Sequence, residues 1–80
     1  MDNSVKQKSH LFKRERFERL AVHRTNEILR KLKILGNCSN RSAYDYSEAD
    51  INKVFSEIER QVRAVRAKFY FPKNRGDFKL

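Results

Sequence analysis

Apolar residues in the first half of the chain recur in steps of three, four and seven from residue 11 to residue 35. This spacing places them on one face of an α-helix. The face consists of Phe17, Leu20, Ala21, Ile28, Leu32 and Leu35. Ser9 is a candidate N-cap, and Gly36 stands where a C′ glycine ends many helices. The pattern therefore predicts a helix over residues 11–35.

A second amphipathic segment follows residues 36–46, a stretch whose composition is typical of a loop. Ser47 precedes an acidic first turn in an arrangement close to a capping box. Apolar residues then recur in two series with a period of seven, the seam spacing of a coiled coil or helical bundle. The two series are Ile51, Ile58 and Val65, and Phe55, Val62 and Phe69. The pattern predicts a helix over residues 48–70 that ends because of Pro72.

Two amphipathic helices joined by a loop predict an all-α fold, a two-helix antiparallel hairpin. A hairpin covers each apolar stripe incompletely, so we expect the chain to dimerise into a four-helix bundle. The expected organisation is a flexible N-terminus over 1–9, a helical hairpin domain over 10–70 and a basic aromatic tail over 71–80. The residues expected in the core or dimer seam are Phe17, Ala21, Ile28, Leu32, Leu35, Ile51, Phe55, Ile58, Val62, Val65 and Phe69.

The charge balance changes this picture from a plain helical protein to one that attracts polyanions. The chain has 19 Lys and Arg against 10 Asp and Glu, a net charge of +9 on 80 residues. Nucleic acid is the first candidate partner, with DNA favoured over RNA, and an acidic protein surface is the second. The residues expected to contact phosphates are Arg16, Arg19, Arg30, Lys33, Lys53, Arg60, Arg63, Lys73 and Arg75. The alternative interpretation of these faces is a solvated surface.

Other features of the sequence concern local pairing and the tail. Glu15–Arg19 and Glu27–Lys31 are spaced i,i+4 and are expected to support the first helix. Aromatic residues of the tail alternate with cations, an arrangement that stacks bases in single-strand binders or packs Phe71 back on the helices.

Several function classes find no support in the sequence. The loop is too long for a helix-turn-helix motif, and no zinc-finger or RNP pattern occurs. Cys38 is the single cysteine, and its spacing from His10 and His23 matches no usual metal site. No nucleophile with a nearby base is evident, so we expect neither an enzyme nor a cofactor.

No apolar run approaches the roughly 20 residues of a membrane span, and the polar N-terminus lacks a signal-peptide core. A cytoplasmic protein without membrane contact is expected.

A resemblance covers the stretch from Arg16 to Phe69. The segments that carry it are Arg24-Thr25-Asn26-Glu27-Ile28-Leu29, Leu35-Gly36-Asn37-Cys38-Ser39-Asn40, Tyr44-Asp45-Tyr46-Ser47, Val54-Phe55-Ser56-Glu57-Ile58-Glu59 and Ala67-Lys68-Phe69. In these the chain resembles a group of small uncharacterised helical proteins carried on mobile genetic elements of Gram-positive bacteria. The resemblance implies an accessory protein of a plasmid, phage or integrative element and supplies no site residues. It leaves DNA binding and inhibition of a host factor both open.

The function expected from the sequence is therefore a small basic nucleic-acid-binding accessory or regulatory protein of a mobile element. It would act as a homodimer that contacts the phosphate backbone with little base specificity. The alternative is a protein-interaction module, acting as an inhibitor or a subunit of a host or element-encoded complex.

Overall fold

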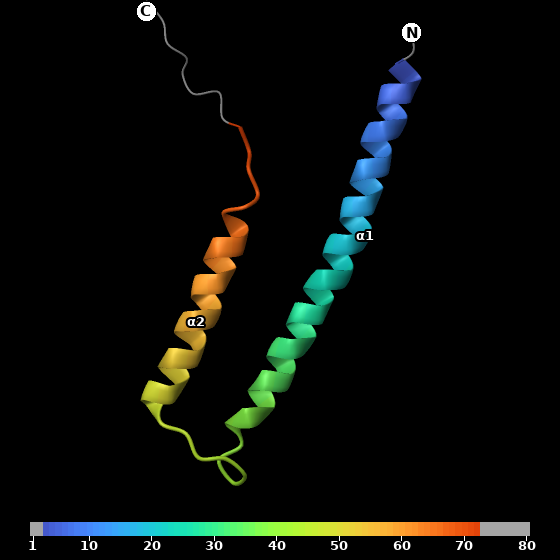
Figure 1. Ribbon diagram of the computed structural model, residues 1–80. Coiled ribbons are helices and arrows are strands. Elements are labelled where there is room, and N and C mark those ends of the chain that lie inside the picture. Colours follow the sequence, from blue (N-terminus) through green and yellow to red (C-terminus); the bar gives the residue numbers. More distant parts are fainter. Residues whose placement is uncertain (1–2, 73–80) are drawn as a thin grey trace, which may run out of the picture. The chain divides into compact units, whose positions relative to one another are not determined.

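The computed structural model describes the backbone of residues 3–72 and the side chains of residues 10–72. This part of the chain is all-helical and contains no strand, as predicted (Figure 1). Its elements are α1 (Asn3–Gly36), the short 3-10 helix η1 (Asn37–Ser39) and α2 (Glu48–Arg66). The chain divides into two units, Met1–Tyr44 and Asp45–Leu80. The predicted phosphate contacts Lys73 and Arg75 lie outside the described residues.

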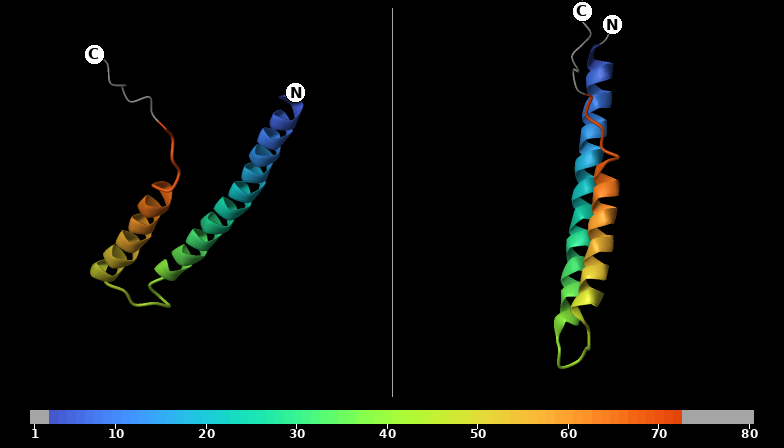
Figure 2. Two further views of the ribbon diagram at one scale, coloured as in Figure 1. Left: turned by 45° about the horizontal axis from the view of Figure 1, so that its top comes forward. Right: turned by 90° about the vertical axis from the view of Figure 1, so that its left-hand side faces the viewer.

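Helix α1 is one continuous helix of 34 residues (Figures 1 and 2). It begins at Asn3, so the predicted start at residue 11 is wrong and Ser9 lies inside the helix instead of capping it. The apolar period fails to mark the beginning because the first helical turns are polar, and polar residues such as Lys and Gln are good helix formers. The expected flexibility of residues 1–9 stays a prediction.

The C-terminal end of α1 also differs from the prediction. Gly36 has φ −58° and ψ −25°, which is right-handed helical geometry, and it is the last residue of α1. A C′ glycine would take the left-handed conformation, so that prediction is wrong. The chain continues into η1, a tighter helical turn that needs no left-handed residue.

The connection between the helices is organised by Asn40. Its carbonyl oxygen accepts hydrogen bonds from the backbone N–H of Ala43 at 3.1 Å and of Tyr44 at 3.0 Å. Its side-chain Oδ1 accepts a third from the N–H of Ser42 at 3.0 Å, which is an Asx-turn. The polar composition that predicted a loop here thus supplies the loop's own hydrogen bonds.

The N-terminus of α2 is the predicted capping box. The N–H of Asp50 donates to Ser47 Oγ at 3.0 Å, and the N–H of Ser47 donates to Asp50 Oδ2 at 2.9 Å. Two backbone N–H groups that a free helix end would leave unpaired are satisfied in this way. The cap fixes the start of α2 at Glu48, three residues before Ile51, the first apolar residue of its stripe.

Helix α2 ends earlier than predicted. Its last residue is Arg66, followed by a turn in which the N–H of Lys68 donates to the Val65 carbonyl at 3.0 Å and that of Phe69 to the Arg66 carbonyl at 3.1 Å. Phe69, predicted as part of the helical seam, therefore lies beyond the helix, and Pro72 does not terminate it. Aromatic residues are weaker helix formers than Ala or Leu, which favours an end before the Phe-Tyr-Phe run.

No side chain among residues 10–72 is buried. The most protected apolar side chains on the two helices, which are half-buried, are Leu20, Ala21, Leu35, Ile51 and Ile58. Each helix thus keeps its apolar face accessible, and the antiparallel hairpin and its dimer stay predictions.

Candidate functional site

Helix α1 carries the densest set of cations in the described chain. Arg16, Arg19, Arg30 and Lys33, here called the α1 cation face, are all exposed. At about 100° per residue they fall within one arc of the helix surface, and Arg19 and Lys33 lie about 21 Å apart along the axis. The sequence prediction that these four residues share a face follows directly from the continuous helix through them.

Their ionic partners divide this face into two kinds of cation. The guanidinium of Arg30 is ion-paired with the carboxylate of Glu27. Arg16, Arg19 and Lys33 have no ion pair among the described side chains. Within the same residues the predicted Glu15–Arg19 pair is absent, and Glu27 is bound to Arg30 in place of Lys31. Three cations of the face are therefore uncompensated.

Arg14 lies outside the α1 cation face and has partners of its own. Its Nη2 is 3.6 Å from Glu18 Oε2, and its guanidinium carbon is 5.7 Å from the centre of the Phe17 ring. An exposed ion pair of this kind contributes little to stability. The ion pair does neutralise the Arg14 charge locally, through the carboxylate of Glu18.

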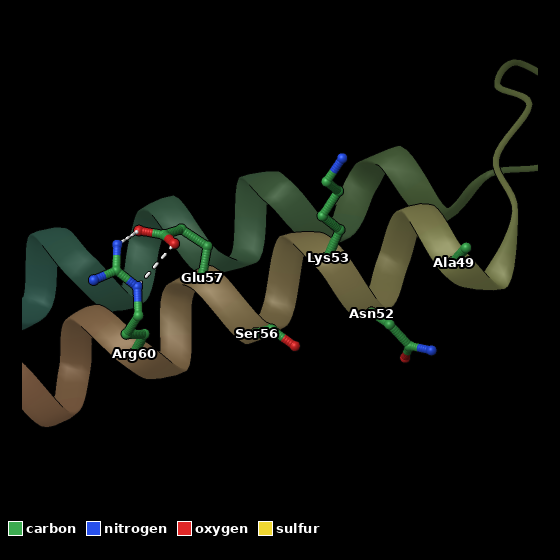
Figure 3. A pocket seen from close by; sticks show the side chains of 6 residues that line it. All are labelled: Ala49, Asn52, Lys53, Ser56, Glu57 and Arg60. Carbon is green, nitrogen blue, oxygen red and sulfur yellow. Dashed lines mark hydrogen bonds and ion pairs between the residues drawn. The ribbon is translucent and has the colours of Figure 1, made fainter.

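Helix α2 presents a shallow depression on the side opposite its apolar stripe. Figure 3 shows its lining side chains, Ala49, Asn52, Lys53, Ser56, Glu57 and Arg60. Arg60 donates from Nε at 3.1 Å and from Nη2 at 2.6 Å to the two oxygens of Glu57, and Gln61 Nε2 donates to the same carboxylate at 3.1 Å. These bonds, that from Arg60 above all, hold the pKa of the Glu57 carboxyl below its ordinary value. The carboxylate stays charged and compensates Arg60.

The net charge of α2 differs from that of α1. Its acidic residues, Glu48, Asp50, Glu57 and Glu59, equal in number its basic residues, Lys53, Arg60, Arg63 and Arg66. Lys53 and Arg63 have no ion pair within the described part of the chain, yet they belong to a helix without excess charge. Of the predicted phosphate contacts on the two helices, the structure groups the α1 set on a basic helix and places the α2 set on a neutral one.

The apolar residues of α2 form one compact stripe. At about 100° per residue, Ile51, Val54, Phe55, Ile58, Val62 and Val65 fall within roughly 100° of the helix surface. All of them are exposed or half-buried.

The apolar surface of α1 is broader than that of α2 and consists of two stripes. The predicted set of Phe17, Ala21, Ile28, Leu32 and Leu35 is here called the α1 seam. A further apolar set, which the predicted stripe does not include, consists of Leu11, Val22 and Leu29 and is here called the second α1 stripe. Its members are 58%, 59% and 57% exposed, and the 100° step turns it by about 100° from the seam. Spacings of 11 and seven residues would have revealed it, because both are close to whole numbers of helical turns.

The remaining candidate chemistry is sparse. Cys38 is exposed in η1. Among the described residues no three His, Cys, Asp or Glu side chains gather as metal ligands would. None of the described helices is both long enough and apolar enough for a membrane crossing. Comparison of the chain with protein-family models, with curated proteins and with solved structures found no match.

Proposed function

We propose that this chain is a small nucleic-acid-binding accessory or regulatory protein that contacts backbone phosphates through the α1 cation face. The observation that carries the proposal is the presence of three uncompensated cations, Arg16, Arg19 and Lys33, on one exposed face of a basic helix. Helix α2 has no excess charge, and α1 carries the larger part of the chain's net charge of +9. A role on a plasmid, phage or integrative element, in the cytoplasm, is the setting that the resemblance implies.

The number of free cations sets the expected salt dependence. Each phosphate neutralised on duplex DNA contributes about −0.9 to the slope of log affinity against log salt, so three contacts predict a slope of about −3. Arg30 adds a fourth contact if phosphate displaces Glu27. That displacement costs little, because an exposed pair on a helix is worth only about 0.2–0.5 kcal/mol.

Duplex DNA is the expected polymer. The major groove of B-form DNA is about 12 Å wide and admits an α-helix, whereas the major groove of A-form RNA is too narrow for side-chain readout. The contacts proposed for the α1 cation face are to backbone phosphates, which carry no sequence information, so we expect little sequence preference.

We further infer that the chain folds as an antiparallel hairpin and self-associates into a four-helix bundle. The support is the compact α2 stripe and the α1 seam, both exposed or half-buried over helical lengths that need a packing partner. An exposed apolar patch of this kind also favours the alternative function, a protein-interaction module that docks as an inhibitor or subunit.

The test compares two triple variants in binding to labelled duplex DNA of random sequence. The first changes Arg19, Arg30 and Lys33 to Gln, which keeps helix propensity nearly constant. The matched control changes Lys13, Arg24 and Lys31 to Gln, which removes the same charge from the same helix on another side. Affinity is measured from about 50 mM to about 200 mM salt, and helicity is checked by circular dichroism.

The first variant should bind more weakly on all sequences, and its salt slope should flatten by roughly one unit per lost contact. The control should lose less affinity and keep most of the slope. Equal effects of both variants would show that net charge acts without a defined face. Little DNA affinity at about 150 mM salt, together with a protein partner that survives nuclease, would overturn the proposal in favour of the interaction module.

A further inference from the structure

Three consecutive aromatic side chains are exposed just beyond the end of α2. Phe69 is 57% exposed, and Tyr70 and Phe71 are each 79% exposed, the two largest fractions among the exposed large apolar side chains of the described residues. No ring contact or side-chain hydrogen bond engages them within residues 10–72. The described chain thus does not pack Phe71 against its helices, which was one of the two roles expected for that ring.

The backbone attaches this aromatic run to the helix and prevents it from continuing the helix. The N–H of Phe69 donates to the carbonyl oxygen of Arg66, the last residue of α2, at 3.1 Å. Pro72 disfavours helical geometry at Phe71, because the proline ring clashes with the backbone of the residue before it. The run therefore starts from the last turn of α2 and leaves it along a non-helical backbone (Figure 1).

Charge is segregated along α2, although the helix as a whole has no excess charge. All of its acids lie within residues 48–59, and residues 60–72 contain no acid. Arg63, Arg66 and Lys68 are exposed and have no ion pair among the described side chains. The helix dipole favours cations in the last turn, but it explains neither Lys68, which lies beyond the helix, nor the exposed rings.

We propose that these six residues bind single-stranded nucleic acid. They are here called the α2 end patch and are Arg63, Arg66, Lys68, Phe69, Tyr70 and Phe71. The cations hold backbone phosphates and the rings stack on unpaired bases, the combination on which single-strand binders rely. A duplex cannot use the rings in this way, because the faces of its bases are covered by neighbouring base pairs, whereas unstacked bases are free to stack on aromatic side chains.

The distribution of charge favours a nucleic-acid strand over a lipid surface. A helix that lies in a membrane interface is rich in Lys and Arg along its polar face, whereas α2 presents four carboxylates over residues 48–59. The uncompensated cations are confined to the short stretch that also carries the rings. A patch of this size matches a few nucleotides, since single-strand sites cover about 4–16 nucleotides. The proposal is independent of duplex binding through the α1 cation face.

The first test compares binding of the full chain to two labelled oligomers of about 12 nucleotides. One is oligothymidylate, and the other is an abasic oligomer that keeps the phosphates and lacks the bases. The parent should bind oligothymidylate about tenfold or more tightly than the abasic oligomer, the effect of at least one stacked base. Equal affinity for the two oligomers would overturn the proposal.

Ring variants locate the stacking. Tyr70→Leu and Phe71→Leu should each weaken binding to oligothymidylate about tenfold and leave binding to the abasic oligomer unchanged. Phe12→Leu is the matched control, because it removes a ring of α1 that is 63% exposed, and it should change neither affinity. Loss of the preference for bases in Phe12→Leu, with the preference intact in the other two variants, would refute the assignment to the α2 end patch.

Charge variants separate this site from the α1 cation face. Changing Arg63, Arg66 and Lys68 together to Gln should flatten the salt slope for oligothymidylate by about 2, since each phosphate neutralised on a single strand contributes about −0.7. The triple Gln variant of the α1 cation face should weaken duplex binding and keep the tenfold preference for bases. An unchanged single-strand slope in the first variant would exclude the three cations from the site.

A fluorescent reporter tests stacking directly. The chain has no Trp, so Phe71→Trp introduces a single indole into the α2 end patch. Oligothymidylate should quench its fluorescence through stacking, and the abasic oligomer should not. Vesicles that contain phosphatidylserine serve as the lipid probe and should leave the emission unchanged. A blue shift with these vesicles, without quenching by oligothymidylate, would assign the patch to a lipid surface and overturn the proposal.

Discussion

The capping box of α2 offers a direct test of how the second helix is stabilised. Ser47→Ala removes the hydroxyl that accepts from the N–H of Asp50 at 3.0 Å, while the reciprocal bond from the N–H of Ser47 to Asp50 Oδ2 has no need of that hydroxyl. Loss of a Ser N-cap costs about 1 kcal/mol, within a range of about 0.5–2 kcal/mol. That energy lowers the equilibrium constant for forming the first turn about fivefold.

The expected result is fraying confined to the start of α2. Carbon chemical shifts of residues 48–52 should move toward coil values, and amide protection there should fall, while α1 is unchanged. Ser56→Ala is the matched control, because Ser56 lies inside α2 and is exposed. It should maintain or raise helicity, since Ala is the better helix former. Unchanged shifts at residues 48–52 in Ser47→Ala would refute the capping argument.

The same box predicts a pH dependence. The backbone N–H of Ser47, and secondly its side chain, hold the pKa of Asp50 below its ordinary value. A carboxyl whose folded-state pKa is lowered stabilises the helix above the ordinary value of about 3.9, and this stabilisation is lost as pH falls through the folded-state pKa. In Ser47→Ala, nuclear magnetic resonance titration should show the Asp50 pKa rising only part of the way toward the ordinary value, because the larger cause, the backbone N–H of residue 47, is retained. An unchanged Asp50 pKa in this variant would contradict the contribution of the Ser47 side chain.

Two further variants test other local features of the helices. Gly36→Ala should stabilise the end of α1 by about 0.5–1 kcal/mol in thermal or denaturant unfolding, because Gly36 has right-handed helical angles and a Cβ there meets nothing within 4 Å. Destabilisation by this variant would indicate that Gly36 adopts the left-handed conformation of a C′ glycine. Glu57→Gln should release Arg60 from its compensating carboxylate and steepen the salt slope of DNA binding by up to about one unit, beyond the effect of the unpaired control Glu59→Gln; equal slopes for the two variants would show that Arg60 contacts no phosphate.

The sequence by itself determined the helical class, the two helical regions and the capping box. The reason is that these features depend on neighbours within one or two turns. The seven-residue period from Ile51 to Val65 indicates a helix whatever its surroundings are, and Ser47 with Asp50 is sufficient for the cap. The grouping of Arg16, Arg19, Arg30 and Lys33 on one face likewise follows from the 100° step alone.

The three-dimensional structure decided the helix ends and the ionic partners. The period of the apolar residues carries no information where a helical turn is polar, so it did not predict that α1 begins at Asn3. It also did not predict that α2 ends at Arg66. Glu27 has basic residues at both i+3 and i+4, and the side-chain geometry selects Arg30. The structure also shows that neither helix buries its own apolar stripe. A single amphipathic helix has no surface to pack against, and so its stripe requires another helix to exclude water.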